Sequence, residues 1–260
     1  MRIDFFKYQG TGNDFVILDN RDRRYSFTKE QVAFLCNRRF GIGADGLMLL
    51  QLKDGYDFEM VYYNADGGES SMCGNGGRCL VAFAKQIGLI TDKTKFIAVD
   101  GEHDAIVRAD GIVELKMQDV KEVERGFDYC VLNTGSPHYI QWVNDVDAVD
   151  AFAEGRKIRY NERFFKEGIN VNFVQVLTEG LKVRTYERGV EDETYSCGTG
   201  VTAAALSAAD VNKTEQEIAV QTPGGQLSVK LHRNSDSSFD HIWLCGPATF
   251  VFNGSIDLNN

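Results

Sequence analysis

Among its 260 residues the chain has no apolar run of about 18 residues, the length that a membrane-spanning helix requires. Its first seven residues carry the charges of Arg2, Asp4 and Lys7, where a secretory signal peptide needs a continuous apolar stretch. Basic residues are few, since 28 Lys and Arg stand against 38 Asp and Glu, and the formal net charge is -10. These absences exclude a general nucleic-acid-binding protein and predict a soluble, cytoplasmic protein with no nucleic-acid or membrane partner.

Zinc-binding patterns are also missing. No Cys-x-x-Cys occurs, and the four histidines, at 103, 138, 232 and 241, lack the spacing of zinc ligands, so we expect no metal site. The six cysteines of a cytoplasmic chain need not form disulfides. Four of them lie in apolar helix-like or strand-like surroundings and are predicted to be buried as small hydrophobic residues: Cys36, Cys79, Cys130 and Cys245.

The other two cysteines each enter a glycine-rich turn that leads into an apolar segment. These turns are Met72-Cys73-Gly74-Asn75-Gly76-Gly77-Arg78 and Ser196-Cys197-Gly198-Thr199-Gly200-Val201. A cysteine at the start of a helix is a candidate thiolate, because the unpaired N–H groups and the positive end of the helix dipole favour negative charge there. One such turn alone is more often a tight strand-to-helix corner, but a matched pair favours two thiols that act together.

The spacing of the two turns indicates a duplicated domain. Cys197 follows Cys73 by 124 residues, close to half of the chain, and the offset recurs between Gly46 and Asn170. A solenoid would repeat every 20 to 50 residues instead. We therefore predict an α+β fold with domains at 1–120 and 121–260, joined through 118–129, each with a mixed or antiparallel sheet around a cysteine-headed helix.

Periodicity and capping signals predict the other elements. Thr28 and Gln31 form a capping box for a helix that runs to about Arg39. Its counterpart in the second half is predicted from about Asp145 through Phe152, closed by Gly155. Further helices are predicted at 77–86 and 201–209, and alternating strands at 105–108, 181–186 and 226–231.

Two equivalent thiols suit the inversion of a stereocentre. One thiolate removes a proton from carbon while a thiol on the opposite side supplies one, and the reverse reaction exchanges the roles. A helix end contributes at most about 2 kcal/mol, whereas enzymes remove about 8 to 23 kcal/mol of barrier. Fixed hydrogen-bond donors and positioning must supply the rest, and the glycines leave backbone N–H groups open to a substrate carboxylate.

Eight motifs together resemble the diaminopimelate epimerase family, in order and along nearly the whole chain. They are Gly12-Asn13-Asp14-Phe15, Asn64-Ala65-Asp66-Gly67, Cys73-Gly74-Asn75-Gly76, Pro137-His138, Asn170-Val171-Asn172-Phe173, Tyr186-Glu187-Arg188-Gly189, Cys197-Gly198-Thr199-Gly200 and Pro223-Gly224-Gly225. The resemblance implies a cofactor-independent epimerase that interconverts LL- and meso-2,6-diaminopimelate in lysine and peptidoglycan precursor biosynthesis. It also implies two pseudosymmetric domains, each a barrel-like sheet around a central helix, with the active site in the cleft between them, and a homodimer.

The resemblance further implies roles for individual residues. Cys73 and Cys197 match the catalytic acid/base thiols, His138 a position that influences them, and Glu187 one that contacts substrate near the reacting centre. The N–H groups of Gly74, Asn75, Gly198 and Thr199 match those that receive the reacting carboxylate. Positions that match the remaining substrate-binding residues are Asn13, Asn64, Asn170 and Arg188.

Two positions depart from the family pattern: Ser136, where many members have Asn, and Gly46, where some have Gln. Both departures bear on the distal end of the substrate. Two alternatives stay open from the sequence. The same two-thiol mechanism could act on another amino acid, as in proteins that resemble proline racemase, or the chain could be a non-catalytic ligand-binding or redox protein. His138 could be a structural hydrogen-bonder, and Arg188 could form a local ion pair with Glu187.

Overall fold

The computed structural model describes residues 1–70 and 72–258. The chain forms two compact units: unit 1 is Met1–Leu115 with Pro247–Asn260, and unit 2 is Lys116–Gly246. The last segment of the chain therefore belongs with the first unit, whereas the sequence-based boundaries leave it in the second half. Among residues 1–70 and 72–258, no helix is long and apolar enough to cross a membrane.

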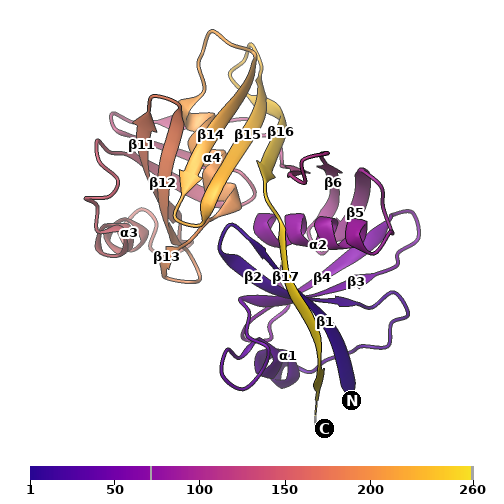
Figure 1. Ribbon diagram of the computed structural model, residues 1–260. Helices are drawn as coiled ribbons and strands as arrows, with labels where there is room; N and C mark the ends of the chain where they lie inside the picture. Colours follow the sequence, from indigo (N-terminus) through magenta and orange to yellow (C-terminus); the bar gives the residue numbers. More distant parts are fainter. Residues whose placement is uncertain (71, 259–260) are drawn as a thin grey trace. The chain divides into compact units, whose positions relative to one another are not determined.

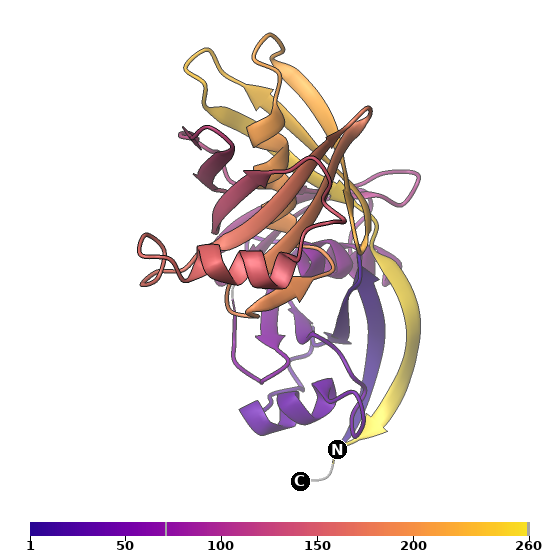
Figure 2. The same ribbon diagram turned by 90° about the vertical axis from the view of Figure 1, so that its left-hand side faces the viewer.

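Unit 1 contains one continuous ladder of eight strands. In order of pairing the strands are β17 (Thr249–Asp257), β1 (Arg2–Gly10), β2 (Asn13–Asp19), β3 (Gly46–Gln51), β4 (Phe58–Asn64), β5 (Lys93–Ala98), β6 (Gly101–Val107) and β7 (Val113–Lys116). The pairs β2–β3 and β4–β5 are parallel, and the others are antiparallel. Figures 1 and 2 both show β17 running beside β1, so the two ends of the chain share one sheet.

Unit 2 repeats the same sequence of pairings. Its ladder runs β8 (Glu124–Arg125), β9 (Tyr129–Asn133), β10 (Pro137–Trp142), β11 (Asn170–Leu177), β12 (Gly180–Glu187), β14 (Glu215–Thr222), β15 (Gly225–Arg233) and β16 (Phe239–Gly246). Again the third and fifth pairs, β10–β11 and β12–β14, are parallel. The short strand β13 (Asp192–Thr194) adds to the end of β12. This shared topology supports the duplication, and the predicted α+β class is confirmed.

One helix packs on each of the two faces of each sheet. In β3, Leu47 and Leu49 join the apolar cluster of helix α1 (Lys29–Cys36), while Met48 faces the central helix α2 (Gly74–Gln86). Every residue of β3 is buried for this reason. In β11 the alternation is the same: Val171 and Phe173 pack with helix α3 (Ala151–Arg159), and Asn172 faces the central helix α4 (Gly198–Ala208).

The two outer helices test the predicted capping signals differently. The capping box of α1 is present, with Gln31 N donating to Thr28 Oγ1, although the helix ends at Cys36 rather than near Arg39. The prediction for α3 is wrong by about six residues at its start, because Asp150 and not Asp145 caps it. Gly155 does not close this helix but lies inside it, where a Cβ would come 2.4 Å from Tyr186 Cβ.

The central helices were predicted in the right places but begin three residues earlier than expected. The strands predicted at 181–186 and 226–231 lie within β12 and β15. The strand predicted at 105–108 lies in β6 except for its last residue, Arg108, because β6 ends at Val107. Cys36, Cys79, Cys130 and Cys245 are all buried, as predicted.

Candidate functional site

Cys73 and Cys197 occupy the same position in their units, the N-cap of the central helix. Both have extended backbone angles, with φ -98° and ψ 129° at Cys73 and φ -113° and ψ 111° at Cys197. Neither side chain makes a capping hydrogen bond. The first N–H groups of a helix have no acceptor within the helix, so Gly74, Asn75, Gly198 and Thr199 present a surface suited to an anion.

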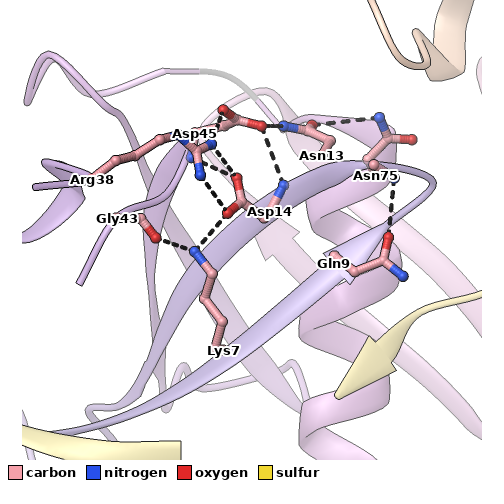
Figure 3. A network of polar contacts seen from close by, with 9 residues as sticks. Lys7, Gln9, Asn13, Asp14, Arg38, Gly43, Asp45 and Asn75 are labelled. Atoms are coloured by element: carbon pink, nitrogen blue, oxygen red, sulfur yellow. Dashed lines mark hydrogen bonds and ion pairs between the residues drawn. The ribbon is translucent and has the colours of Figure 1, made fainter. Parts of the chain in front are cut away.

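In unit 1 an asparagine side chain faces the cysteine. Asn13 Oδ1 lies 3.6 Å from Cys73 Sγ and 3.4 Å from Asn75 Nδ2, which donates to it. The orientation of the Asn13 side-chain amide is fixed, because its Nδ2 donates to Asp45 Oδ2 at 2.7 Å (Figure 3). A carboxylate only accepts hydrogen bonds, so Asp45 fixes the carbonyl oxygen of Asn13 toward the thiol.

Asp45 is in turn held by an ionic network (Figure 3). Arg38 Nη2 lies 2.8 Å from Asp45 Oδ1 and 2.7 Å from Asp14 Oδ1, and the buried Lys7 Nζ lies 2.7 Å from Asp14 Oδ2. Burial by itself raises the pKa of Asp14, but the hydrogen bonds and charges of Arg38 and Lys7 outweigh it and lower the pKa to about 2. Asp14 therefore stays ionised at neutral pH, and its ion pairs hold this part of the site in place.

Arg78 braces the first turn of α2 from inside the unit. Its side chain is 0% exposed, and Nη1 donates to Gly74 O at 3.3 Å while Nη2 donates to Asn75 Oδ1 at 3.1 Å and Thr11 Oγ1 at 3.2 Å. No short sequence motif marks this arginine or Asp45 as part of the site. Their roles depend on contacts between segments that are 30 to 70 residues apart in the chain.

The remaining unit 1 position, Asn64, ends β4 directly opposite Gly46 of β3. No side chain fits at residue 46, because a Cβ there would come 2.5 Å from the Tyr62 ring and 2.7 Å from Tyr63 O. The tyrosine ring fills the space that a glutamine would need, which gives a physical reason for the departure at Gly46.

In unit 2 a chain of hydrogen bonds leads from the sheet to Cys197. Asn172 Nδ2 donates to Tyr139 O at 3.1 Å and to His138 Nδ1 at 3.0 Å, while Asn172 Oδ1 accepts from Thr185 Oγ1 at 2.9 Å. Because Nδ1 of His138 accepts, the proton of the neutral ring is on Nε2, which lies 2.8 Å from Thr199 Oγ1.

Thr199 connects this chain to the cysteine. Its hydroxyl oxygen accepts from His138 Nε2, so its own proton is available to Cys197 Sγ, 3.4 Å away. Burial and, to a smaller extent, the charge of Arg188 lower the pKa of His138 from 6.5 to about 3, so the ring is neutral at physiological pH. His138 therefore acts here as a fixed donor to Thr199.

The two helix N-termini differ in what lies beneath them. Gly46 and Asn170 are equivalent positions of the two units. Phe15 is paired with Gly46 and His138 is paired with Asn170, so Phe15 is the counterpart of His138. A Cβ at Gly76 would meet Met48 and Phe15, whereas a Cβ at Gly200 would meet Asn172 and His138. The sheet side chains that pack against the first turn are thus apolar for α2 and polar for α4.

A second polar group of unit 2 joins Asn170, Ser136 and Arg188. Asn170 Nδ2 donates to Ser136 Oγ at 2.8 Å, Asn170 Oδ1 accepts from Arg188 N at 2.8 Å, and Arg188 Nη2 lies 3.4 Å from Ser136 Oγ. Neighbouring Glu187 accepts from Thr194 Oγ1 at 3.0 Å. The structure thus brings Asn170 and Arg188 together around Ser136, the other departure from the family pattern.

Comparisons with known proteins agree with these motifs. The family model described as "Diaminopimelate epimerase" matches residues 5–123 and 130–251. The chain belongs to the diaminopimelate epimerase family. A diaminopimelate epimerase from Flavobacterium psychrophilum is 50% identical over 256 residues, covering 96% of this chain and 99% of the relative. One from Chlorobaculum tepidum is 43% identical over 258 residues, with 96% and 99% covered.

Solved structures share the fold at low sequence identity. A PhzF-family phenazine biosynthesis protein from Bacillus anthracis has a TM-score of 0.77 at 15% identity, with 99% of this chain and 100% of that chain covered. A hydroxyproline epimerase from Agrobacterium vitis has a TM-score of 0.71 at 14% identity, with 100% and 93% covered. Membership of the diaminopimelate epimerase family, within a fold shared by other epimerases, identifies this chain as an isomerase.

Proposed function

We propose that this protein interconverts LL- and meso-2,6-diaminopimelate without a cofactor, with Cys73 and Cys197 as the two acid/base thiols. The observation that carries the proposal is the identical placement of both cysteines at the N-cap of a central helix, in a member of this family. The product serves lysine and peptidoglycan precursor synthesis. We further propose a homodimer that acts in the cytoplasm.

The reaction needs no oxidant or reductant. The thiolate takes the α-proton, so an S–H bond forms as the C–H bond breaks, and the second thiol gives its proton to the opposite face of the same carbon. The negative charge passes from one sulfur to the other. Backbone N–H groups of Gly74, Asn75, Gly198 and Thr199 donate to the reacting carboxylate and stabilise the charge that develops on it.

The hydrogen-bond directions support an assignment of the proton that the two sulfurs share in the free enzyme. Asn13 Oδ1, held toward Cys73 by Asp45, accepts from an S–H group but repels a thiolate. Thr199 offers its hydroxyl proton to Cys197, which suits a thiolate. We therefore assign the thiol to Cys73 and the thiolate to Cys197 in the free enzyme. Cys197 is then the base for the epimer whose α-proton faces it, with Cys73 as the acid, and the reverse reaction uses Cys73 as the base once the proton has passed to Cys197.

Asn170 and Arg188 suit the distal amino-acid group of the substrate. The guanidinium can grip a carboxylate with two parallel hydrogen bonds. Ser136 Oγ, within 3.4 Å of Arg188 Nη2 and 2.8 Å of Asn170 Nδ2, keeps both groups in place with a shorter side chain than asparagine. Asn13 and Asn64 of unit 1 complete the proposed binding set, and Glu187 contacts the substrate near the reacting carbon.

The proposal is tested by incubating the reduced protein with LL-diaminopimelate in deuterium oxide, without added cofactor. We expect meso product with deuterium at the inverted α-carbon, and no epimerisation by Cys73→Ala or Cys197→Ala. Free proline and hydroxyproline serve as competing substrates and should not be racemised. Full epimerisation by either alanine variant would refute the two-thiol mechanism, and turnover of proline alone would refute the substrate.

A further inference from the structure

Three adjacent strands of unit 2 place metal-binding side chains in one row. Glu215 of β14 is paired with His232 of β15, and His232 is paired with Asp240 of β16. Directly opposed residues of a sheet project from the same face. His232 Nδ1 lies 2.7 Å from Asp240 Oδ1, and His232 Nε2 lies 3.9 Å from Glu215 Oε1.

A β-bulge adds a second imidazole to this row. Between Lys230 and His232 the register shifts, so that His241 and Ile242 of β16 stand opposite the single residue Leu231. His241 has a left-handed backbone conformation, with φ 47°. Without the bulge, His241 would point to the face opposite Asp240, but here its Nδ1 lies 2.9 Å from Asp240 Oδ1. A left-handed conformation is uncommon for a non-glycine residue, and such conformations concentrate at functional sites.

The donor atoms lie near the separations that a coordination site requires. Two donors that share a zinc ion at about 2.0–2.2 Å each lie roughly 3 Å apart. The side chains of His232, Asp240 and His241 offer donor atoms that all lie within 4.8 Å of one another. Asn234 Nδ2 donates to the other oxygen of Asp240 at 3.2 Å, and Glu215 faces the far nitrogen of His232, as carboxylates do for metal-bound imidazoles.

We propose that His232, Asp240 and His241 form a binding site for a divalent transition metal of the zinc type, with a water-accessible fourth position. Two imidazoles and a carboxylate are the donor set that such ions prefer. On binding, the metal is coordinated by Nδ1 of both rings, and each ring carries its remaining proton on Nε2. The Glu215 carboxylate faces the Nε2–H group of His232. His241 is 76% exposed, so the ion can enter directly from solvent.

This site is separate from the proposed catalytic thiols. At the other end of the β14–β15 hairpin, Gly224 N donates to Tyr195 O, two residues before Cys197. Seven residue steps separate the pair Thr222–Gly225 from the pair Glu215–His232. At about 3.3 Å per residue this places the row roughly 23 Å along the hairpin. The inference therefore stands or falls independently of the epimerase mechanism.

The test is isothermal titration calorimetry of the reduced, chelator-free full-length chain with zinc chloride. We expect a zinc ion at this site and at least about 100-fold weaker binding there in His241→Asn, because losing a ligand exceeds the 10- to 100-fold effect of losing an outer partner. Asparagine tolerates a positive φ, so this variant retains the bulge. Glu215→Gln is expected to weaken binding about tenfold.

Two controls separate this site from the thiols. His103→Gln, a histidine beside Asp100 in unit 1, should bind zinc as the unaltered chain does. Cys73→Ala with Cys197→Ala should keep the site, and cobalt(II) on that double variant should give visible absorption without a sulfur-to-metal band. Epimerase activity of metal-free His241→Asn should be unchanged. Equal zinc affinity in His241→Asn, or binding that disappears in the double cysteine variant, would overturn the proposal.

Discussion

Two asparagine side chains, Asn13 and Asn172, decide which hydrogen bonds each cysteine can make. Each amide is oriented by a group that can only accept, the Asp45 carboxylate for Asn13 and the Tyr139 carbonyl for Asn172. The first leaves a carbonyl oxygen facing Cys73, and the second leads through His138 and Thr199 to a hydroxyl proton facing Cys197. In the proposed assignment, equivalent backbone positions therefore carry opposite proton states.

This assignment predicts different reactivities for the two thiols. Thr199→Val removes the hydroxyl while keeping a β-branched shape, and we expect alkylation of Cys197 by iodoacetamide at pH 7 to slow about tenfold, since a hydrogen bond to a charged group is worth about 1.5–3 kcal/mol. Thr199→Ser should restore the rate. Peptide mass spectrometry measures both cysteines together. Faster alkylation of Cys73 than of Cys197 in the unaltered protein would reverse the assignment.

The buried His138 predicts a pH-dependent stability. Its pKa is about 3 in the folded protein and 6.5 when unperturbed, so between these values the unfolded state binds more protons. Stability must then fall as pH drops below 6.5, by up to about 1.4 kcal/mol per pH unit from this residue. Carboxyl groups whose pKa is lowered in the folded protein, such as Asp14 and Glu191, also lose stabilisation as the pH falls toward 4, so a variant that lacks the histidine is needed to isolate its contribution.

Urea unfolding at pH 4, 5, 6 and 7 measures this slope. In His138→Gln, which keeps a polar side chain but cannot titrate, the slope over this window should be smaller by roughly 1 kcal/mol per pH unit. Parallel curves for the two proteins would show that His138 is protonated in the folded state, which would also remove the basis for its hydrogen bond to Thr199.

From the sequence, residue types at fixed spacing were sufficient to predict the two cysteines, their glycines and the polar residues around Arg188 as members of the site. They were not sufficient for Asp45, Arg78 or Thr185, because each acts through a partner that is distant in sequence. Asn172 stood in a recognised motif, but its role follows only from strand register, which places it rather than Val171 toward α4. His232 and His241 lacked zinc-ligand spacing because a hairpin and a bulge, not a short motif, bring them together.

The N-termini of the two central helices, α2 and α4, are expected to tolerate different substitutions. Gly200→Ala would place a Cβ 2.3 Å from Asn172 Oδ1, and Gly76→Ala would place one 3.2 Å from Met48 Cε, the flexible end of its side chain. Both substitutions favour the helix by about 1 kcal/mol. Any loss of activity then reports the displaced neighbours and not helix formation.

We expect Gly200→Ala to lower kcat/KM at least about tenfold, because moving Asn172 disrupts the hydrogen bonds through His138 to Thr199. Gly76→Ala should stay within about threefold of the unaltered enzyme, since methionine repacks readily. Steady-state kinetics with LL-diaminopimelate, with circular dichroism to verify folding, makes the comparison. Equal activity of the two variants would contradict a role for Asn172 and His138, the polar side chains that pack against the first turn of α4.

The error in α3 shows what local signals miss. Asp145 and Gly155 look like the start and end of a helix, but the Asp145 carboxylate accepts from Asp147 N in a loop turn, and Gly155 lies inside the helix. The glycine is needed because Tyr186 of β12 packs against it. Tertiary packing therefore explains the glycine inside α3, while a local cap at Asp150 sets the start of this helix; α1 was predicted correctly at its start from its capping box.

The sheet of unit 1 takes one of its strands from the far end of the chain. β8 pairs with β9 in unit 2, whereas the corresponding position beside β1 in unit 1 is taken by β17. Met1 N donates to Leu258 O at 2.7 Å, and Leu258 N donates to Met1 O at 2.8 Å. The sequence offset of 124 could reveal the repeat but not this exchange, because the pairing partner of β1 lies outside its own half.

Leu258 is buried in the apolar cluster between α1 and the unit 1 sheet, with Ile3 and Phe5. We expect Leu258→Ala to lower the free energy of unfolding by about 2–5 kcal/mol, as for other buried leucines. Val251→Ala, on an exposed position of β17, should change it by no more than about 0.5 kcal/mol. Hydrogen exchange locates the effect: in Leu258→Ala, protection should fall in β1 and β2 and stay unchanged in β15 and β16. Loss of protection in β15 and β16 instead would mean that the last strand stabilises unit 2, as the boundary at residue 120 implies.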